Sequence, residues 1–268
     1  MKVFHICTIT NNLKQYEEMK SSYILAGFTE ERCRYSLFDN SKGNIFDPRV
    51  FNSFKSETTE PYIIFCHQDV LLNKGDGFNE LVEIVTELDQ LDPRWAVAGN
   101  SGLTKRGEHV SKITDPASRY YRRWSKGFPY PVQSLDENFL VIRTQADISC
   151  NINTFYLYAH ELCLDAFDKG YSSYVIDFHV THLSPGKYDH DGHSTFSSAI
   201  RFFEDKWSQK FFFRYYRPLY APMMCFSKYG FLRQVGKIGI SLWELTTQIN
   251  YLIRRTFRYG KKLLTVGI

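Results

Sequence analysis

Short apolar runs and amphipathic stretches alternate along residues 3–207. Uncharged runs of β-branched and aromatic residues predict strands, and apolar residues spaced three or four positions apart predict helices. The predicted strands cover residues 3–10, 35–38, 62–66, 95–99, 132–142 and 174–178. The predicted helices cover residues 13–25, 51–57, 78–91, 161 to a stop at 170, and 198–207. This order predicts an α/β fold with a mostly parallel, twisted sheet flanked by helices.

The strand at residues 62–66 is followed directly by His67, Gln68 and Asp69. Open α/β sheets place ligand groups at the carboxyl ends of their strands. In an extended segment, residues two apart point the same way, so His67 and Asp69 can contact one bound object, such as a divalent metal that carries a phosphate. A polar strand end in which Asp69 caps the next turn explains the same residues, and the spacing alone does not choose between the two.

Other candidate groups also lie at predicted element ends. Asp39 and Asn40 follow the second strand and could contact a base or ribose, although Asp-Asn-Ser-Lys-Gly is also an ordinary loop composition. Gly99 ends a buried strand, and a glycine there is expected where the backbone passes close to a ligand or to another chain segment. Asp136 belongs to an acidic pair in the middle of the strand predicted at 132–142. Glu161, with His160, begins a predicted helix and could cap it or act as a general base. Three apolar residues of this helix are expected to face inward, namely Leu162, Ala166 and Phe167.

Residues 100–134 combine Arg, Lys and aromatic side chains with Gly and Pro. This composition favours a long loop or an excursion over the carboxyl edge of the sheet, where it could cover a substrate. The run Arg119 to Trp124 also permits nucleic-acid binding, because basic and stacking groups alternate there. No nucleic-acid-binding module surrounds that run.

Four of the eight histidines fall between residues 179 and 193. The Pro-Gly context suits a loop that orders over a substrate. A second interpretation is a metal-dependent hydrolase that uses the side chains His179, His182, Asp189, His190 and His193.

The length of 268 residues and the composition, 43% hydrophobic and 23% charged, are typical of one elaborate α/β domain with a C-terminal appendage. The six cysteines form no Cys-x-x-Cys pair, which predicts buried thiols in a reducing cytoplasm. The N-terminus lacks the long apolar core of a signal peptide.

The net charge of +4 is unevenly distributed. From Lys206 onward there are 12 Lys or Arg residues and Glu244 as the only acid, so residues 1–205 carry about −7 and the remainder about +11. A helix is predicted at 241–259, and no apolar run reaches the roughly 20 residues needed to span a bilayer. Basic and aromatic residues together favour an interfacial element on an anionic membrane, while packing on the core or on a second subunit explains them equally well.

Five segments in this order resemble the GT-A glycosyltransferases, and among them a bacterial group similar to family 2 with an HQDV-type motif. The segments are Phe65 to Val70, Leu135 to Phe139, Leu157 to Cys163, His182 to Ser184 and Phe203 to Trp207. The resemblance covers residues 3–207, which would form a catalytic domain of residues 1–207 followed by an extension of residues 208–268.

The resemblance implies an inverting hexosyltransferase that moves a sugar from a nucleotide diphosphate, with UDP as the expected nucleotide, to a hydroxyl of a surface glycan or lipid-linked acceptor. It implies that Asp69 and His182 bind Mn²⁺ or Mg²⁺, that Glu161 is the base and that Asp136 lies near the acceptor. His67 replaces the first Asp of the usual Asp-x-Asp motif and would contact ribose or diphosphate. The expected nucleotide-binding set is Thr8, Asp39, Asn40, His67, Gln68 and Gly99.

The expected location is the cytoplasmic face of the cell membrane, in lipopolysaccharide, capsule or teichoic-type assembly. The oligomeric state stays open, with a homo-oligomer as one alternative. Besides the hydrolase, a non-catalytic module that binds membrane or nucleic acid is the remaining alternative.

Overall fold

The computed structural model describes residues 2–42, 47–114, 122–152, 154, 156–183 and 192–246. The chain divides into two compact units. The first unit contains residues 1–203 and 217–221, and the second contains residues 204–216 and those from 222 onward. The division at residue 203 lies four positions before the predicted boundary at 207, and the short return of residues 217–221 to the first unit was not predicted.

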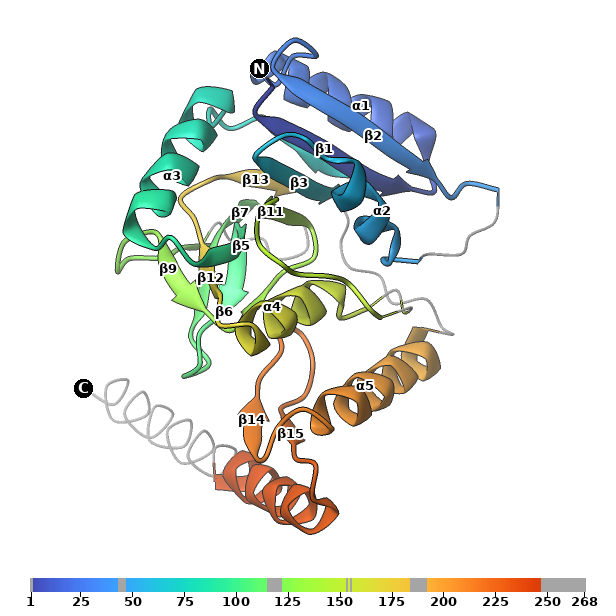
Figure 1. The fold of residues 1–268 in the computed structure, drawn as a ribbon, viewed down its shortest axis with the longest axis vertical. Coiled ribbons are helices and arrows are strands. Elements are labelled where there is room, and N and C mark those ends of the chain that lie inside the picture. The colour runs from blue at the N-terminus through green and yellow to red at the C-terminus, as the bar shows by residue number, and fades with distance from the viewer. Residues whose placement is uncertain are drawn as a thin grey trace, which may run out of the picture. The chain divides into compact units, whose positions relative to one another are not determined.

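A seven-stranded sheet forms the centre of the first unit (Figure 1). Its order is β2 (Cys33–Asp39), β1 (Phe4–Thr10), β3 (Tyr62–His67), β11 (Phe139–Arg143), β5 (Trp95–Gly99), β12 (Ser172–Val175) and β9 (Tyr130–Val132). The pairings make five strands run in one direction, whereas β11 and β9 run in the other. The predicted fold class, an α/β fold with a mostly parallel sheet, is confirmed.

Helices cover both faces of this sheet. Helices α1 (Leu13–Leu25) and α3 (Phe78–Leu91) contribute to the core cluster that contains Ile64 and Cys66 of β3. Phe65 points to the opposite face, where its ring contacts α2 (Val50–Glu57) and the first residue of α4 (Tyr158–Asp168). This follows from the alternation of side chains along a strand. The chain segment of β3 is therefore buried on both sides, as its uncharged sequence predicts.

The described residues between 100 and 134 form short strands and not the predicted long loop. These residues contribute to a second sheet with the order β10 (Ser134–Leu135), β6 (Ser101–Leu103), β7 (His109–Thr114), β13 (Val180–His182) and β4 (Val70–Leu71), while β8 (Arg122–Arg123) pairs with β7. The single strand predicted at 132–142 is also wrong, because β9, β10 and β11 are separate. The acidic pair lies in the turn between β10 and β11.

Two further boundaries differ from the prediction. Helix α4 begins at Tyr158, three residues before Glu161, so Glu161 completes the first turn instead of starting the helix. Phe167 is 42% exposed and Leu91 is 62% exposed, whereas both were expected on apolar faces. Each lies in the last turn of its helix.

The second unit is built from the end of α5 (Gly192–Ser208), a hairpin and a helix over residues 230–246. The hairpin consists of β14 (Arg214–Tyr216) and β15 (Met224–Phe226). A Cβ added at Gly236 would lie 2.1 Å from Cys225 Sγ, so glycine lets the helix lie directly on the hairpin. This helix begins eleven residues before the predicted start at 241, and residues 247–259 of the prediction lie outside the described residues.

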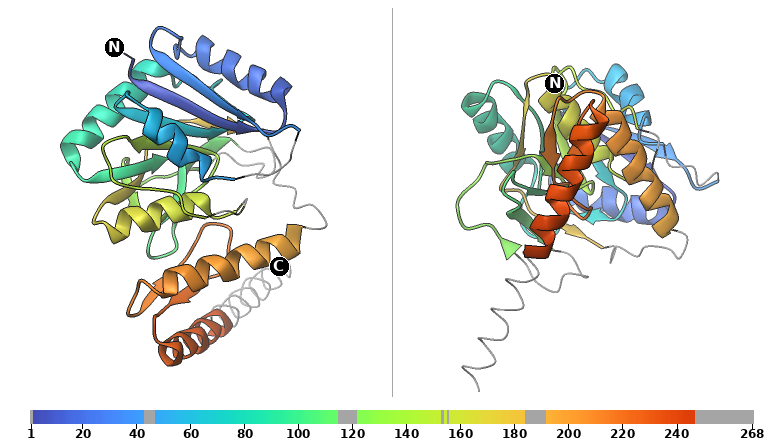
Figure 2. Two further views of the ribbon diagram at one scale, coloured as in Figure 1. Left: turned by 45° about the vertical axis from the view of Figure 1, so that its right-hand side comes forward. Right: turned by 90° about the horizontal axis from the view of Figure 1, so that it is seen from below.

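The helix over residues 230–246, which is red in Figure 2, also has an apolar face that is exposed. Its exposed members follow helical spacing and are Phe231, Val235, Ile238, Leu242 and Leu245. None of the helices in the described part of the chain has the length and apolarity to cross a membrane. The six cysteines are buried and form no disulfide.

Candidate functional site

Two histidines and one aspartate meet at the end of β3. His67 is the last residue of β3, Asp69 follows two positions later, and His182 ends β13, which pairs with β4. One ligand atom from each of these residues lies within 4.8 Å of the other two. His182 Nε2 is 3.4 Å from Asp69 Oδ1. The structure thus brings together the two predicted metal ligands and adds His67 to them.

The charge states of this group suit a cation. Burial alone would raise the pKa of Asp69, but the hydrogen bond from His182 and the nearby imidazoles lower it overall. Burial lowers the pKa of His67 to about 4. At neutral pH the site therefore holds a carboxylate and a neutral imidazole, which are the forms that bind metals.

Tyr158 determines which nitrogen of His67 is protonated. The Tyr158 hydroxyl donates to the backbone oxygen of Glu137 over 2.8 Å, because a carbonyl can only accept. Its oxygen then accepts a hydrogen bond from His67 Nε2 over 2.6 Å. His67 Nδ1 consequently keeps its lone pair, and such outer hydrogen bonds are known to orient metal-binding histidines.

The donor set fits some divalent metals better than others. It offers two imidazole nitrogens and one carboxylate oxygen. Mn²⁺, Zn²⁺ and Fe²⁺ accept such mixed ligands, whereas Mg²⁺ prefers oxygen alone. Of the two metals expected from the sequence, the residues favour Mn²⁺.

Glu137 lies next to this group, although only Asp136 of the acidic pair was predicted as a site residue. Burial raises the pKa of Glu137 to about 8, and the nearby charge of Asp136 acts in the same direction. Hydrogen bonds from backbone N–H groups at the start of α4 act in the opposite direction. Its Oε1 is buried and has no hydrogen-bond partner among the described residues. The contact between Glu137 and Tyr158 joins positions far apart in the chain, so no local spacing could have indicated it.

The two predicted catalytic carboxylates differ in access. Asp136 is partly exposed, and its Oδ1 accepts the N–H of Asn138 over 3.2 Å. Glu161 is 1% exposed in the first turn of α4. A side chain so deeply buried does not face a substrate, so the placement of Glu161 argues against its predicted role as base.

Two predicted nucleotide-binding residues are part of the core. Thr8 is fully buried, and its hydroxyl lies 3.5 Å from Cys66 Sγ. Gly99 lies where a Cβ would be 3.0 Å from the backbone oxygen of Phe139 in the neighbouring strand. The close approach expected at Gly99 is therefore to β11, and neither residue is carried into the proposed site.

Besides His67, three predicted nucleotide-binding residues remain, and they lie along the carboxyl edge of the sheet. They are Asp39, Asn40 and Gln68. The register pairs Asp39 with Thr10 at the ends of β2 and β1. Asp39 is exposed, and hydrogen bonds from the side chain and from the N–H of Ser41 lower its pKa. The N–H of Asn40 donates to Thr10 O over 2.7 Å. The amide of Gln68 accepts from Asn11 N over 2.8 Å and donates to Asn11 Oδ1 over 2.7 Å. Gln68 thus fastens the turn after β1, a role that its neighbours in sequence did not indicate.

The histidines between 179 and 193 do not form one group in the described residues. His179 Nε2 lies 2.9 Å from Thr114 Oγ1, and the His179 N–H donates to Asp76 over 2.7 Å, whereas His182 contacts Asp69. Asp189, His190 and the side chain of His193 lie outside the described residues. In the run from Arg119 to Trp124, the Trp124 ring packs on Tyr130 at 5.0 Å.

Three solved structures share a distant structural likeness with the chain. Residues 1–349 of S. aureus TarS are 14% identical, with a TM-score of 0.47 and coverage of 77% of this chain and 65% of TarS. GalNAc-T7 with UDP, GalNAc and Mn²⁺ is 9% identical, with a TM-score of 0.45 and coverage of 77% and 50%. STIV A197 is 12% identical, with a TM-score of 0.42 and coverage of 69% and 86%. Similarity at this level assigns no function to the chain.

No model of a known protein family matches the chain. A protein of Fuscovulum blasticum named "ATP synthase subunits region ORF 6" is 30% identical in an alignment of 203 positions that covers 71% of this chain and 79% of that protein. Its name describes a gene region and states no activity. The chain belongs to the same protein family as this Fuscovulum blasticum protein.

Proposed function

We propose that the first unit is a metal-dependent glycosyltransferase that uses a nucleotide-diphosphate sugar. The observation that carries the proposal is the convergence of Asp69, His67 and His182 at the end of a central strand. Support also comes from the polar edge beside it, where Asp39 follows β2 and Gln68 fastens the turn after β1. The edge of a parallel sheet is where α/β folds bind nucleotides.

The chemistry of sugar transfer requires these residue types. A divalent cation, when bound, supplies positive charge to the departing diphosphate. Asp69, His67 and His182 would hold it, and Tyr158 keeps His67 Nδ1 available. The acceptor hydroxyl needs a base, and we assign this role to Asp136, because it is partly exposed whereas Glu161 is buried. General-base catalysis contributes about 10²- to 10⁴-fold.

Direct attack assisted by such a base would invert the anomeric centre. UDP is the nucleotide we propose, from the resemblance of the His67–Val70 segment to the HQDV-type enzymes. A surface glycan or a lipid-linked glycan is the proposed acceptor.

The acceptor proposal involves the second unit. Its helix over residues 230–246 exposes an apolar face, and the sequence from Lys206 onward has 12 basic residues and one acidic residue. An apolar face in a basic segment favours an anionic membrane, since each Lys or Arg near such a surface contributes about 1 kcal/mol. We therefore propose peripheral attachment to the cytoplasmic face of the membrane.

The decisive experiment compares Asp69→Asn with the wild type in donor binding. Thermal unfolding is measured with UDP-, GDP-, CMP- and dTDP-sugars, each with and without Mn²⁺, because a ligand that binds the native state raises Tm. We expect a UDP-sugar to raise the Tm of the wild type only with Mn²⁺, and to leave the Tm of Asp69→Asn unchanged.

The matched control is Asp147→Asn, which changes an aspartate whose side chain is 88% exposed. It should respond to the donor as the wild type does. Equal donor binding by Asp69→Asn and the wild type, or no response of the wild type to any donor, would contradict the proposal.

A further inference from the structure

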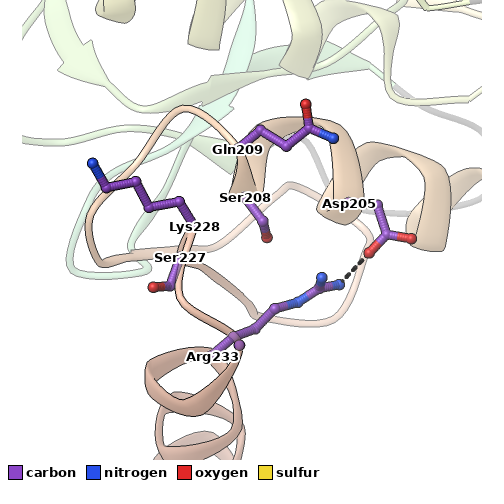
Figure 3. Close-up of a pocket in the computed structure, with 7 residues that line it drawn as sticks. Asp205, Ser208, Gln209, Ser227, Lys228 and Arg233 are labelled. Atoms are coloured by element: carbon purple, nitrogen blue, oxygen red, sulfur yellow. Dashed lines mark hydrogen bonds and ion pairs between the residues drawn. The ribbon is translucent and has the colours of Figure 1, made fainter.

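The second unit contains a pocket of about 420 Å³ where α5 ends and the helix over residues 230–246 begins (Figure 3). A volume in this range is typical of small-ligand sites. The lining comes from the end of α5 and the residue after it, the segment after β15 and the first turns of the helix. It consists of Asp205, Ser208, Gln209, Ser227, Lys228, Gly230 and Arg233. None of these residues belongs to the group around Asp69.

The Ser208 hydroxyl is the first indication of a ligand. Ser208 is 4% exposed, and its Oγ has no hydrogen-bond partner in the described part of the chain. Figure 3 shows this oxygen pointing between Ser227 and Arg233. Buried polar groups in folded proteins nearly always have a partner, so a partner from outside the protein is expected here.

Arg233 provides a second unused donor beside the hydroxyl. Its Nη2 donates to Glu204 over 3.0 Å and to Asp205 over 2.6 Å, and these contacts fix the guanidinium and neutralise the carboxylate in the lining. Its Nε is buried and lacks a partner among the residues that the structure describes. The Arg233 Nε–H can only donate and the Ser208 hydroxyl can rotate to donate, so both match a ligand that supplies acceptor oxygens.

The start of the helix adds backbone donors. The N–H of Arg233 bonds to the carbonyl of Tyr229 over 3.0 Å, so the N–H of Gly230 precedes the first bond within the helix. Gly230 is exposed, and a Cβ added there would meet no atom within 4 Å, which leaves its backbone accessible. Helix N-termini attract anions through these N–H groups and the helix dipole, and the exposed Lys228 adds a positive charge.

We propose that this pocket binds a phosphate monoester group. Its acceptor oxygens match the Ser208 hydroxyl, Arg233 Nε and the N–H of Gly230, and its charge matches the helix N-terminus. The group can come from a soluble phosphate or from a lipid headgroup. The exposed apolar face that begins at Phe231, directly after the pocket, favours the lipid source.

The test uses paired substitutions at Gly230. Proline is tolerated at the first helical position but has no N–H, whereas alanine keeps it. Calorimetric titration of the full chain with inorganic phosphate should give about tenfold weaker binding for Gly230→Pro and for Ser208→Ala, since one hydrogen bond to a charged group is lost in each. Gly230→Ala should bind as the wild type does, and Asp69→Asn should too, which separates this site from the proposed catalytic one.

Vesicles of phosphatidylcholine with and without phosphatidic acid distinguish the two sources. Phosphatidic acid should increase the binding of the wild type to the vesicles. If the ligand is a lipid headgroup, Gly230→Pro reduces only this increase. If the ligand is a soluble phosphate, inorganic phosphate binds and the increase is equal in all variants. Circular dichroism checks folding, and Ser208→Ala decides the question if Gly230→Pro unfolds. Unchanged phosphate binding by a folded Ser208→Ala variant, or no binding of either form by the wild type, overturns the proposal.

Discussion

The hydroxyl of Tyr158 has a precise role in the arrangement around His67. It links the backbone of Glu137 to His67 Nε2, and this leaves Nδ1 of His67 as the nitrogen with a lone pair. A phenylalanine at this position would keep the ring contact with Phe65, at 5.6 Å between centroids, but would not fix the tautomer. Tyr158 is therefore a positioning residue whose contribution can be separated from packing.

We predict that Tyr158→Phe weakens Mn²⁺ binding by about tenfold or more, because loss of an outer hydrogen bond typically costs 10- to 100-fold in metal affinity. Calorimetric titration with Mn²⁺ measures the effect. Tyr130→Phe, which removes a hydroxyl from a partly exposed ring, should retain wild-type affinity. Equal affinities for both variants would show that the tautomer of His67 does not matter.

Local spacing could indicate site residues only where neighbours in sequence form the site, whereas the pairing of His182 with Asp69 was expected from the family resemblance. His67 and Asp69 are two positions apart after a strand, so their spacing indicates that both can contact one bound object, although a polar strand end explains the same spacing. Glu161 looked suitable at a predicted helix start, but its burial depends on how α4 packs. The role of Tyr158 depends on a tertiary hydrogen bond to Glu137, which no local pattern describes.

Among the elements, the helix over residues 230–246 has two apolar faces with different environments. The face with Gly236 and Ile240 is buried, and Gly236 packs on the hairpin. The face with Ile238 and Leu242 is exposed. An exposed apolar stripe of this kind is typical of elements that bind a membrane or another protein.

We predict that Ile238→Asp lowers binding to vesicles that contain anionic lipid, because it places a charge in the apolar face. Ser241→Asp adds the same charge at an exposed polar position and is the matched control. Co-sedimentation with phosphatidylglycerol vesicles should show a larger loss of binding for Ile238→Asp than for Ser241→Asp. Burying an isoleucine side chain typically contributes roughly 1.5–3 kcal/mol, so the expected difference in binding is about tenfold. Equal losses would mean that charge alone determines binding.

Long elements were more predictable than short ones. The bounds of α1 and α3 agree with the prediction, because each helix extends over three or more turns of apolar spacing. Strands β6, β8 and β10 have two or three residues each, too few for alternation to be visible. Their sheet forms through pairing with β7 and β13, which only the tertiary fold provides.

For the whole molecule, buried histidines should limit stability in acid. His5 is fully buried, with its ring nitrogens bonded to Thr58 and Ser36, and burial lowers its pKa to about 4. Burial lowers the pKa of His160 to about 4 as well. Both residues bind a proton near pH 6.5 in the unfolded chain but not in the folded one.

We predict that the free energy of unfolding falls as the pH decreases from about 6.5 to 4, because only the unfolded chain gains these protons over that range. Each histidine contributes up to roughly 3 kcal/mol of this loss. Urea unfolding at several pH values measures the slope of the unfolding free energy against pH. This slope reports how many more protons the unfolded chain binds than the folded one, and His5→Gln should lower that number by about one. A pH-independent free energy between pH 7 and 5 would contradict the prediction.

The proposed metal ligands come from distant parts of the chain, since Asp69 precedes α3 and His182 ends β13. Bringing them together requires the intervening chain to have closed a long loop and paired β13 with β4. A nascent or partly unfolded chain therefore lacks the complete cation site. Occupancy of that site would report that the first unit has finished folding.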